Sequence, residues 1–206
     1  MKNFGLTIPN HTTQIRRGLG WSEFSETYNA EVNYASESYI LTATGIGGRP
    51  DDDEAVSEKG FAVSAQYLHL KPNFRLGGSY FSARTTDDTD REILGPNFVW
   101  GVTDRIYLQG EYDWVRVAPI TGGLLRGYAT YTQLGIEVVR GFDVYAMHEV
   151  KRNDERDKEL AFQGYGPGLR WAPRPHFIFT GQWQKQKTPL YDEFVDSAFF
   201  VTQYWF

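Results

Sequence analysis

Apolar and polar residues alternate one by one along most of this chain, which is the period of a β-strand. The alternation is clearest in residues 61–67 and 74–80, where every second residue is apolar or aromatic. Lys71, Pro72 and Asn73 join these segments, and proline and asparagine are residues that tight turns favour. The pattern therefore predicts an antiparallel hairpin.

The same alternation predicts further strands before and after this hairpin. They cover residues 3–8, 28–34, 39–45, 94–102, 106–114, 128–138, 142–151, 160–171, 177–183 and 195–206. Pro96 lies within one of them, which a bulge or a sheet edge tolerates. The facing of 142–151 stays ambiguous. The count is eleven or twelve strands, and the segment 3–8 decides between them.

The predicted connections are alternately short and long. Short turns fall near residues 36, 72, 104, 141 and 174, and longer charged loops fall near residues 53, 88, 120, 155 and 190. Two of the long loops are expected to cover 85–92 and 187–193. This asymmetry, with strands of about ten residues, is typical of a transmembrane β-barrel. A soluble sandwich also has alternating strands, but here the aromatic residues recur near strand ends, as membrane-interface girdles require.

The chain ends on an aromatic residue, Phe206, with Tyr204, Thr202 and Phe200 at alternate positions before it. This ending resembles the closing strand of bacterial outer-membrane β-barrels, which the barrel-assembly machinery reads as an insertion signal. The resemblance implies that Phe200, Tyr204 and Phe206 form this signal. It also implies an all-β, antiparallel, porin-like barrel of about 12 strands in the outer membrane of a Gram-negative bacterium. An even number of strands is usual for such barrels, and their short turns are periplasmic and their long loops extracellular.

Two interpretations of the chain's extent stay open. In the first, residues 1–206 form a single barrel domain. In the second, Phe4, Gly5 and Leu6 with Pro9 after them resemble an internal stretch of larger porin-like barrels, and the chain is then the C-terminal part of such a barrel. No apolar segment typical of a signal peptide follows the first methionine.

Composition excludes several classes of site. The 206 residues contain no cysteine, which excludes a disulfide framework, a thiolate zinc site and a cysteine nucleophile. The net charge of −5 argues against nucleic acid as a partner. Mean hydropathy is −0.48, and no run approaches the roughly 18 apolar residues of a membrane helix. Alternating strands keep half of their residues polar, so such averages do not exclude a membrane barrel.

The polar residues of the predicted strands are the candidates for the lumen. The pore-lining candidates are Glu31, Arg75, Gln109, Glu111, Asp113, Glu137, Arg170 and Gln182. In an open barrel they would line a wet pore and set its selectivity. In the alternative, Arg75 and Arg170 pair with Glu111 and Glu137 across the interior and plug it.

Catalytic and metal-binding chemistry has little support in the sequence. His148 lies near the outer end of a predicted strand, where an outer-membrane lipid-modifying enzyme could place a histidine beside a serine. No serine occupies a matching position, so we predict no catalytic residue and no cofactor. The acidic groups at 51–54, 87–90 and 154–157 could bind Ca²⁺, but none has EF-hand spacing, and we predict no metal site.

The sequence thus predicts an outer-membrane, porin-like channel for passive diffusion of small polar solutes or ions. An outer-membrane lipid-modifying enzyme and a plugged structural or partner-binding barrel are the alternatives. The expected partners are outer-membrane lipids and lipopolysaccharide, the barrel-assembly machinery and the solutes themselves. A homo-oligomer or a periplasmic partner protein would also be compatible with this interpretation.

Overall fold

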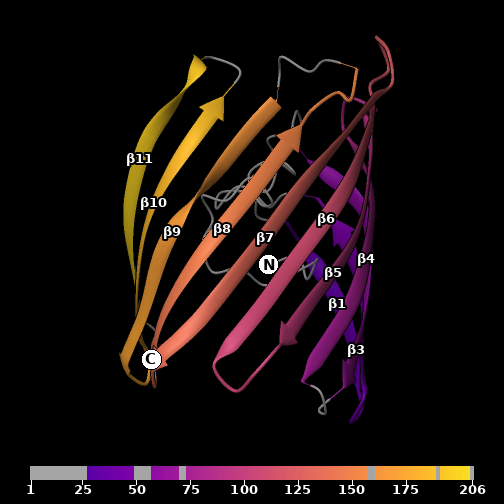
Figure 1. Ribbon diagram of the computed structural model, residues 1–206. Coiled ribbons are helices and arrows are strands. Elements are labelled where there is room, and N and C mark those ends of the chain that lie inside the picture. The colour runs from indigo at the N-terminus through magenta and orange to yellow at the C-terminus, as the bar shows by residue number, and fades with distance from the viewer. Residues whose placement is uncertain (1–26, 49–56, 70–72, 157–160, 189–190, 205–206) are drawn as a thin grey trace.

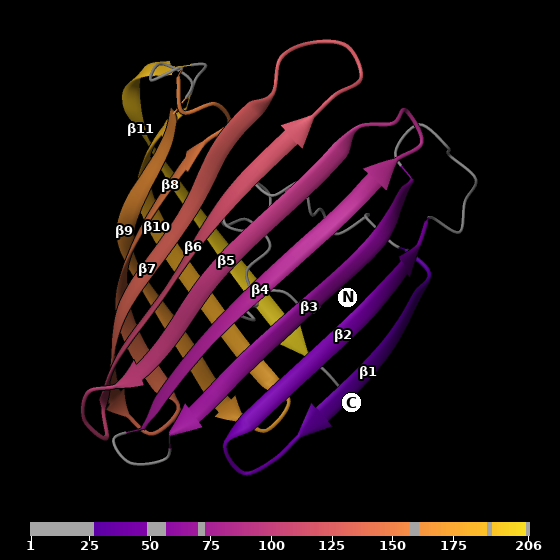
Figure 2. The same cartoon turned by 90° about the vertical axis from the view of Figure 1, so that its right-hand side faces the viewer.

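The computed structural model describes residues 27–48, 57–69, 73–156, 161–188 and 191–204, which form one antiparallel sheet (Figures 1 and 2). Its strands are β1 (Asn29–Ala35), β2 (Tyr39–Gly47), β3 (Glu58–His69), β4 (Phe74–Thr85), β5 (Asp90–Gly101), β6 (Ile106–Ala118), β7 (Leu125–Val139), β8 (Phe142–Arg152), β9 (Ala161–Arg174), β10 (Phe177–Thr188) and β11 (Tyr191–Tyr204). Each strand pairs with the next one in the chain, so the spatial order is the chain order. The predicted all-β antiparallel fold is confirmed.

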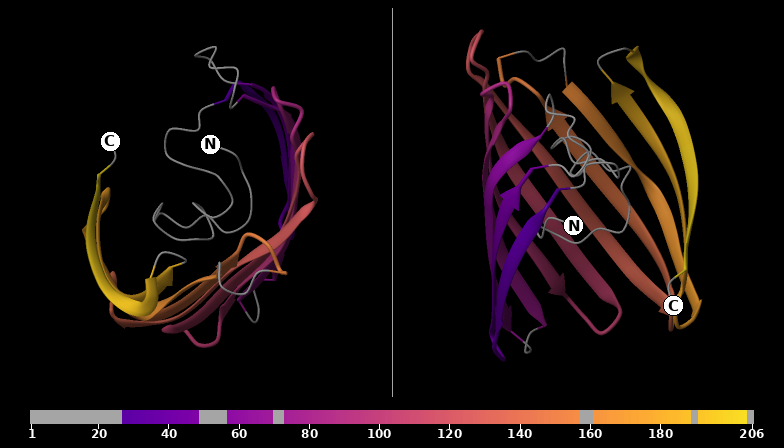
Figure 3. Two further views of the ribbon diagram at one scale, coloured as in Figure 1. Left: turned by 90° about the horizontal axis from the view of Figure 1, so that it is seen from above. Right: turned by 180° about the vertical axis from the view of Figure 1, so that it is seen from behind.

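The sheet curls into a wall that encloses a space on one side. Seen along the strands, the wall is strongly curved, and β1 and β11 are its two edges (Figure 3). Eleven strands are described; the predicted strand 3–8 lies outside the described residues, so the count of twelve stays a prediction. Within the described ranges, no helix is long and apolar enough to span a bilayer.

The two ends of the wall differ in their connections. The turns at the lower end of Figure 1 are short, and three of them contain residues with positive φ: Asn73 at 58°, Gly141 at 79° and His176 at 71°. We call this the turn end and the opposite one the loop end. The predicted loops over 85–92 and 187–193 are too long, because the strands include Thr85 and residues 90–92 of the first stretch and residues 187–188 and 191–193 of the second.

In the first of these stretches, charged residues near the loop end pair across the ladder instead of lying in a loop. Arg84 Nε donates to Oδ1 of Asp90 at 2.7 Å, and this pair continues the β4–β5 register. Only residues 86–89 connect β4 to β5, and only 189–190 connect β10 to β11. Local charge was therefore a poor predictor of where these strands end.

The register defines two faces, because successive side chains of a strand point to opposite sides. The inner face is the one that carries the row Asn97, Glu111, Tyr131, Glu149 and Gly164, one residue each from β5 to β9. The outer face contains the row Tyr80, Leu94, Trp114, Tyr128 and Arg152, from β4 to β8. The same register assigns the facing of β8, which the sequence left ambiguous. Its inner-face residues are Asp143, Tyr145, Met147 and Glu149.

The inner face is the concave one. Its side chains reach past an intervening strand: Arg91 on β5 pairs with Glu58 on β3, and Tyr145 on β8 donates to Gln182 on β10. A buried apolar cluster centred on Phe81 and lying mainly on β2 to β5 shares this face. Curvature crowds these side chains together, whereas it spreads the side chains of the outer face apart.

Candidate functional site

All eight candidate lumen residues lie on the inner face. The ladder places Glu31, Arg75, Gln109, Glu111, Asp113, Glu137, Arg170 and Gln182 there, on β1, β4, β6, β7, β9 and β10. The alternation along each strand was therefore sufficient to assign their facing. Whether they line an open pore stays a prediction.

Carboxylates are concentrated at the middle of the inner face. Glu111 and Asp113 on β6 and Glu149 on β8 are 4%, 0% and 1% exposed. Tyr131 on β7 lies between Glu111 and Glu149 in the same row. Arg75 lies within electrostatic range of Glu111. Sequence reasoning missed Glu149, since it could not assign the facing of β8; a shift of register between Glu137 and Val139, beside the turn at 140–141, sets that facing.

An ion pair marks the turn end of the inner face. Arg170 Nε and Nη2 both donate to Oδ2 of Asp143, at 2.9 and 2.7 Å. The plugged alternative paired Arg170 with Glu111 or Glu137, but its partner is Asp143, the direct cross-strand neighbour. Glu137 instead accepts a hydrogen bond from the backbone N–H of Gly141. These pairs lie along the wall, since each joins neighbouring strands or a strand to its own turn.

A polar recess of about 460 Å³ opens beside this pair. Its lining includes Tyr107, Glu137, Asp143 and Arg170, together with residues of the turn at 103–105. The recess shows that the inner face keeps open, polar volume at the turn end.

Two tyrosine rings on the inner face lie over glycines of adjacent strands. A Cβ built on Gly135 would lie 2.1 Å from Cζ of Tyr107, and one built on Gly168 would lie 2.3 Å from Cζ of Tyr145. Only glycine leaves room for a ring at such distances, so both rings lie flat along the wall. Their hydroxyl groups bond to glutamine amides of the same face, at 2.9 Å from Gln133 and at 3.2 Å to Gln182.

The loop end of the inner face contains a second ion pair. Arg91 and Glu58 approach to 2.6 Å, and each side chain is 13% exposed. Sequence reasoning missed this pair because both residues were assigned to loops. On β1, an edge strand of the described sheet, Glu31 accepts hydrogen bonds from Asn33 and Thr44, so its carboxylate lies within a polar network.

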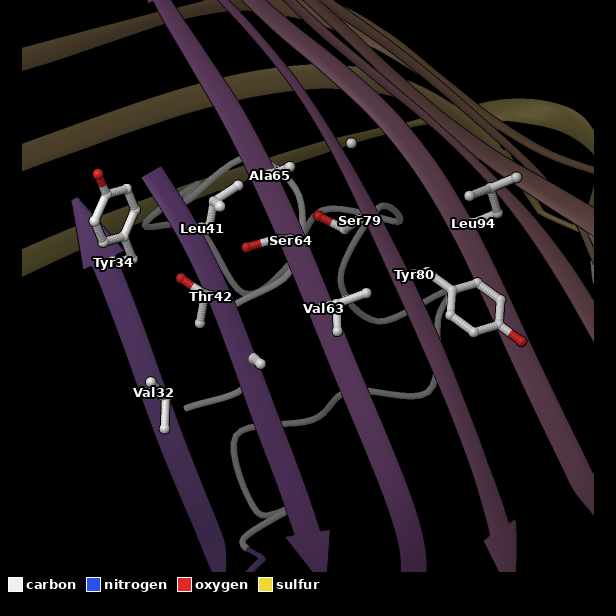
Figure 4. Close-up of a pocket in the computed structure, with 12 residues that line it drawn as sticks. Val32, Tyr34, Leu41, Thr42, Val63, Ser64, Ala65, Ser79, Tyr80 and Leu94 are labelled. Carbon is white, nitrogen blue, oxygen red and sulfur yellow. The ribbon is translucent and has the colours of Figure 1, made fainter. Parts of the chain in front are cut away.

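The outer face is apolar and aromatic. Figure 4 shows Val32, Tyr34, Leu41, Tyr80 and Leu94 around a shallow groove of about 510 Å³ that crosses β1 to β5. Of the predicted insertion signal, Phe200 and Tyr204 lie on the outer face, and Phe206 lies outside the described residues. That the barrel-assembly machinery recognises these residues as an insertion signal stays a prediction.

The structure assigns His148 to the outer face, away from the polar inner wall. Its Nε2 lies 3.3 Å from Nε2 of Gln163, and its cross-strand neighbours are Thr132 and Tyr165. This outward position places no serine beside the imidazole on either neighbouring strand.

In the acidic loop groups that the structure describes, Asp90 and Asp154 pair with arginines, and Asp87 accepts hydrogen bonds from Thr85 and Thr89. Asp154 accepts hydrogen bonds from Nε and Nη2 of Arg156, and these bonds hold the pKa of Asp154 below its usual value. The group at 51–54 lies outside the described residues. Among the residues that are described, no cluster of three histidine or acidic side chains is arranged to hold a metal ion.

No known family description matches the chain, and no curated protein matches its sequence. Its fold is similar to solved outer-membrane structures. A porin is 15% identical over 84% of this chain and 60% of its own, with a TM-score of 0.61. The outer membrane channel DcaP of Acinetobacter baumannii is 10% identical over 86% of this chain and 62% of its own, with a TM-score of 0.62.

A third structure, the NanC porin, is 10% identical over 86% of this chain and 92% of its own, with a TM-score of 0.53. This chain thus spans about three fifths of the first two proteins and most of the third. At these identities the likeness is one of fold. It confirms the prediction of a porin-like fold.

Proposed function

We propose that this protein is a channel of the bacterial outer membrane through which small polar solutes and ions diffuse passively. The curved wall would enclose water on its inner face and contact lipid on its outer face. Transport would need no covalent step, because a wet lumen filters solutes by their size and charge.

The distribution of polarity between the two faces carries this proposal. Large apolar side chains are exposed on the outer face, for example Val32 at 73% and Phe200 at 67%. Charged and amide side chains such as Asp113 and Gln182 are buried on the inner face. A soluble β-protein has the opposite arrangement, whereas transmembrane barrels alternate apolar-out and polar-in along each strand. The strands β2 to β11 have 9 to 15 residues, enough to cross the hydrocarbon region when tilted.

The charge of the inner face favours cations. Its regularly paired positions carry seven carboxylates, those of Glu31, Glu58, Glu111, Asp113, Glu137, Asp143 and Glu149. Four cationic groups accompany them, those of Arg75, Arg91, Lys151 and Arg170. An excess of negative charge on the walls of a narrow passage concentrates cations and depletes anions.

Single-channel recording of the refolded protein in a planar bilayer tests the proposal. Insertion is checked first, by comparing the migration of boiled and unboiled protein on a gel. We expect discrete, ohmic current steps and, in a KCl gradient, a reversal potential of the sign that cation preference gives. A folded, inserted protein without current would refute the channel.

Charge variants test whether the current passes along the inner face. Glu111→Gln should reduce cation preference and Arg75→Gln should increase it, because the two charges have opposite signs. Glu92→Gln removes a carboxylate from the outer face and serves as the control, with unchanged selectivity expected. Equal selectivity in all three variants would show that the current does not pass along the inner face.

A further inference from the structure

The outer face becomes strongly charged at its loop end, within a few residues of where the strands finish. On β3 to β8 this rim consists of Lys59, Arg84, Asp90, Glu92, Arg116, Arg126 and Arg152. Five of these side chains are cationic and two are acidic. The basic rim, as we call this set, thus has a positive excess on the face opposite the acidic inner wall.

Two cationic pairs within the basic rim are directly opposed across the ladder. Lys59 on β3 pairs with Arg84 on β4, and Arg116 on β6 pairs with Arg126 on β7. Directly opposed residues have Cβ atoms about 4.5–5.5 Å apart, and like charges at this position are destabilising. The ladder therefore places like charges opposite each other at two positions, where a bound anion would offset the repulsion.

The acidic members of the rim neutralise only half of each pair. Asp90 binds Arg84 at 2.7 Å, and Glu92 binds Arg116 at 2.7 Å. Lys59 and Arg126 contribute the remaining positive charge. Arg84 and Arg116 are 62% and 52% exposed, so their guanidinium groups stay accessible to a ligand.

An aromatic band lies directly below the basic rim, toward the middle of the strands. Tyr112 stacks on Tyr128 with ring centroids 5.5 Å apart and contacts Trp114 at 4.4 Å. The guanidinium of Arg152 lies 5.8 Å from the ring of Tyr128. Tyrosine and tryptophan gather at the headgroup level of membrane proteins. The rim is therefore at the height of lipid headgroups and is presented to the membrane.

From this arrangement we propose that the basic rim binds a glycolipid with two phosphates, the chemistry of lipid A, in the leaflet at the loop end. Each opposed cationic pair would hold one phosphate by charge-assisted hydrogen bonds. The pairs lie three strands apart, roughly 14 Å, so a lipid with two separated phosphates can bridge them. The choice of leaflet rests on the proposed function, since it assumes an outer-membrane barrel with outward loops.

Native mass spectrometry of the refolded protein from mixed micelles tests this binding. The probes are lipid A, its phosphate-free analogue and phosphatidylglycerol at equal concentrations. We expect lipid A to be retained at one molecule per protein, and at least tenfold more strongly than the other two lipids. Equal retention of phosphatidylglycerol would overturn the proposal, because it would show general attraction of anionic lipids.

Paired substitutions locate the site. Arg116→Gln with Arg126→Gln, and Lys59→Gln with Arg84→Gln, should each reduce lipid A retention at least tenfold. Lys185→Gln with Lys187→Gln removes the same number of charges from the outer face of β10 and is the control. Unchanged retention in the first two variants, or equal loss in the control, would overturn the proposal.

Thermal unfolding gives a second readout, because the effect of one variant on the unfolding temperature should change sign when lipid A is added. Without lipid A, Arg126→Gln should raise the unfolding temperature slightly, because it relieves repulsion of Arg116. With lipid A, the same variant should unfold at a lower temperature than the unsubstituted protein. A variant that is stabilised equally in both conditions would contradict the proposed binding.

Channel recordings in phosphatidylcholine bilayers without lipid A distinguish a failure of the proposed lipid site from a failure of the proposed channel. Variants of the basic rim should conduct as the unsubstituted protein does. Lipid A retention without current would refute only the channel, and current without retention would refute only the lipid site.

Discussion

Substitution of Gly168 by alanine should displace the ring of Tyr145 from the wall into the enclosed space. The new Cβ would lie 2.3 Å from Cζ and 2.5 Å from the hydroxyl oxygen of Tyr145, far inside van der Waals contact. The ring cannot stay flat over β9 at that distance. Rotation toward the enclosed space also breaks its hydrogen bond to Gln182.

Two contributions lower the stability of Gly168→Ala, and a third partly offsets them. Overpacking costs about 1–3 kcal/mol, and loss of the bond to Gln182 costs about 0.5–1.5 kcal/mol. Alanine in a strand regains about 0.5–1 kcal/mol over glycine. Gly168→Ala should therefore lower the free energy of unfolding by about 2 kcal/mol.

Gly78→Ala is the matched control, because a Cβ at this outer-face glycine meets no atom within 4 Å. It should raise the free energy of unfolding by about 0.5–1 kcal/mol. Urea unfolding of both variants in lipid vesicles measures the difference. Single-channel recording then measures obstruction, and Gly168→Ala should conduct less than the unsubstituted protein.

The double variant Gly168→Ala with Tyr145→Ala separates the displaced ring from other effects. Removal of the ring should restore conductance, although stability stays low because the buried contacts of Tyr145 are lost. If Gly168→Ala were as stable as Gly78→Ala and conducted normally, the packing of Tyr145 on β9 would be refuted.

Three further predictions concern the outer face, the inner face and a loop. Val63→Arg places a cation on the lipid-facing surface and should reduce stability in a bilayer by about 2–4 kcal/mol if the site is near the midplane, measured by vesicle refolding. Arg91→Met leaves the carboxylate of Glu58 without its ion pair and should cost about 3 kcal/mol in urea unfolding. Asp154 should titrate below its ordinary pKa of about 3.9, so its bond to Arg156 persists above that pH and is lost only as the pH falls through the lowered pKa. Carboxyl NMR measures this midpoint.

Each of these predictions has its own control. Ser64→Arg places the same cation on the polar inner face and should lose less stability in the bilayer than Val63→Arg; equal losses in the two variants would contradict the assigned faces. Substitution of Glu58 and Arg91 together by methionine should be near neutral, and a loss as large as that of Arg91→Met would argue against pairing. Arg156→Gln should move the Asp154 midpoint up toward the ordinary value, and an unmoved midpoint would exclude Arg156 as the cause.

Alternation along the chain was enough to predict the all-β fold, the hairpin order and the inner face. Such a prediction works because a strand's side-chain period is two, and a one-residue slip would move every apolar residue to the wrong face. Glu111, Asp113 and Gln182 were found in this way, although Gln182 is far from the other two in the sequence. The short turns were also predictable, since residues such as Asn73 tolerate positive φ.

Strand ends, partners and curvature needed the tertiary structure. Asp90 and Arg91 fall within the predicted loop 85–92, but their ion pairs with Arg84 and Glu58 keep them within the ladder. The partner of Arg170 is Asp143 because register, which composition does not encode, puts them opposite each other. The close approach of Tyr145 to Gly168 has the same origin. Periodicity thus determined which way most side chains point, whereas the pairing of strands decided the facing of β8 and which side chains meet.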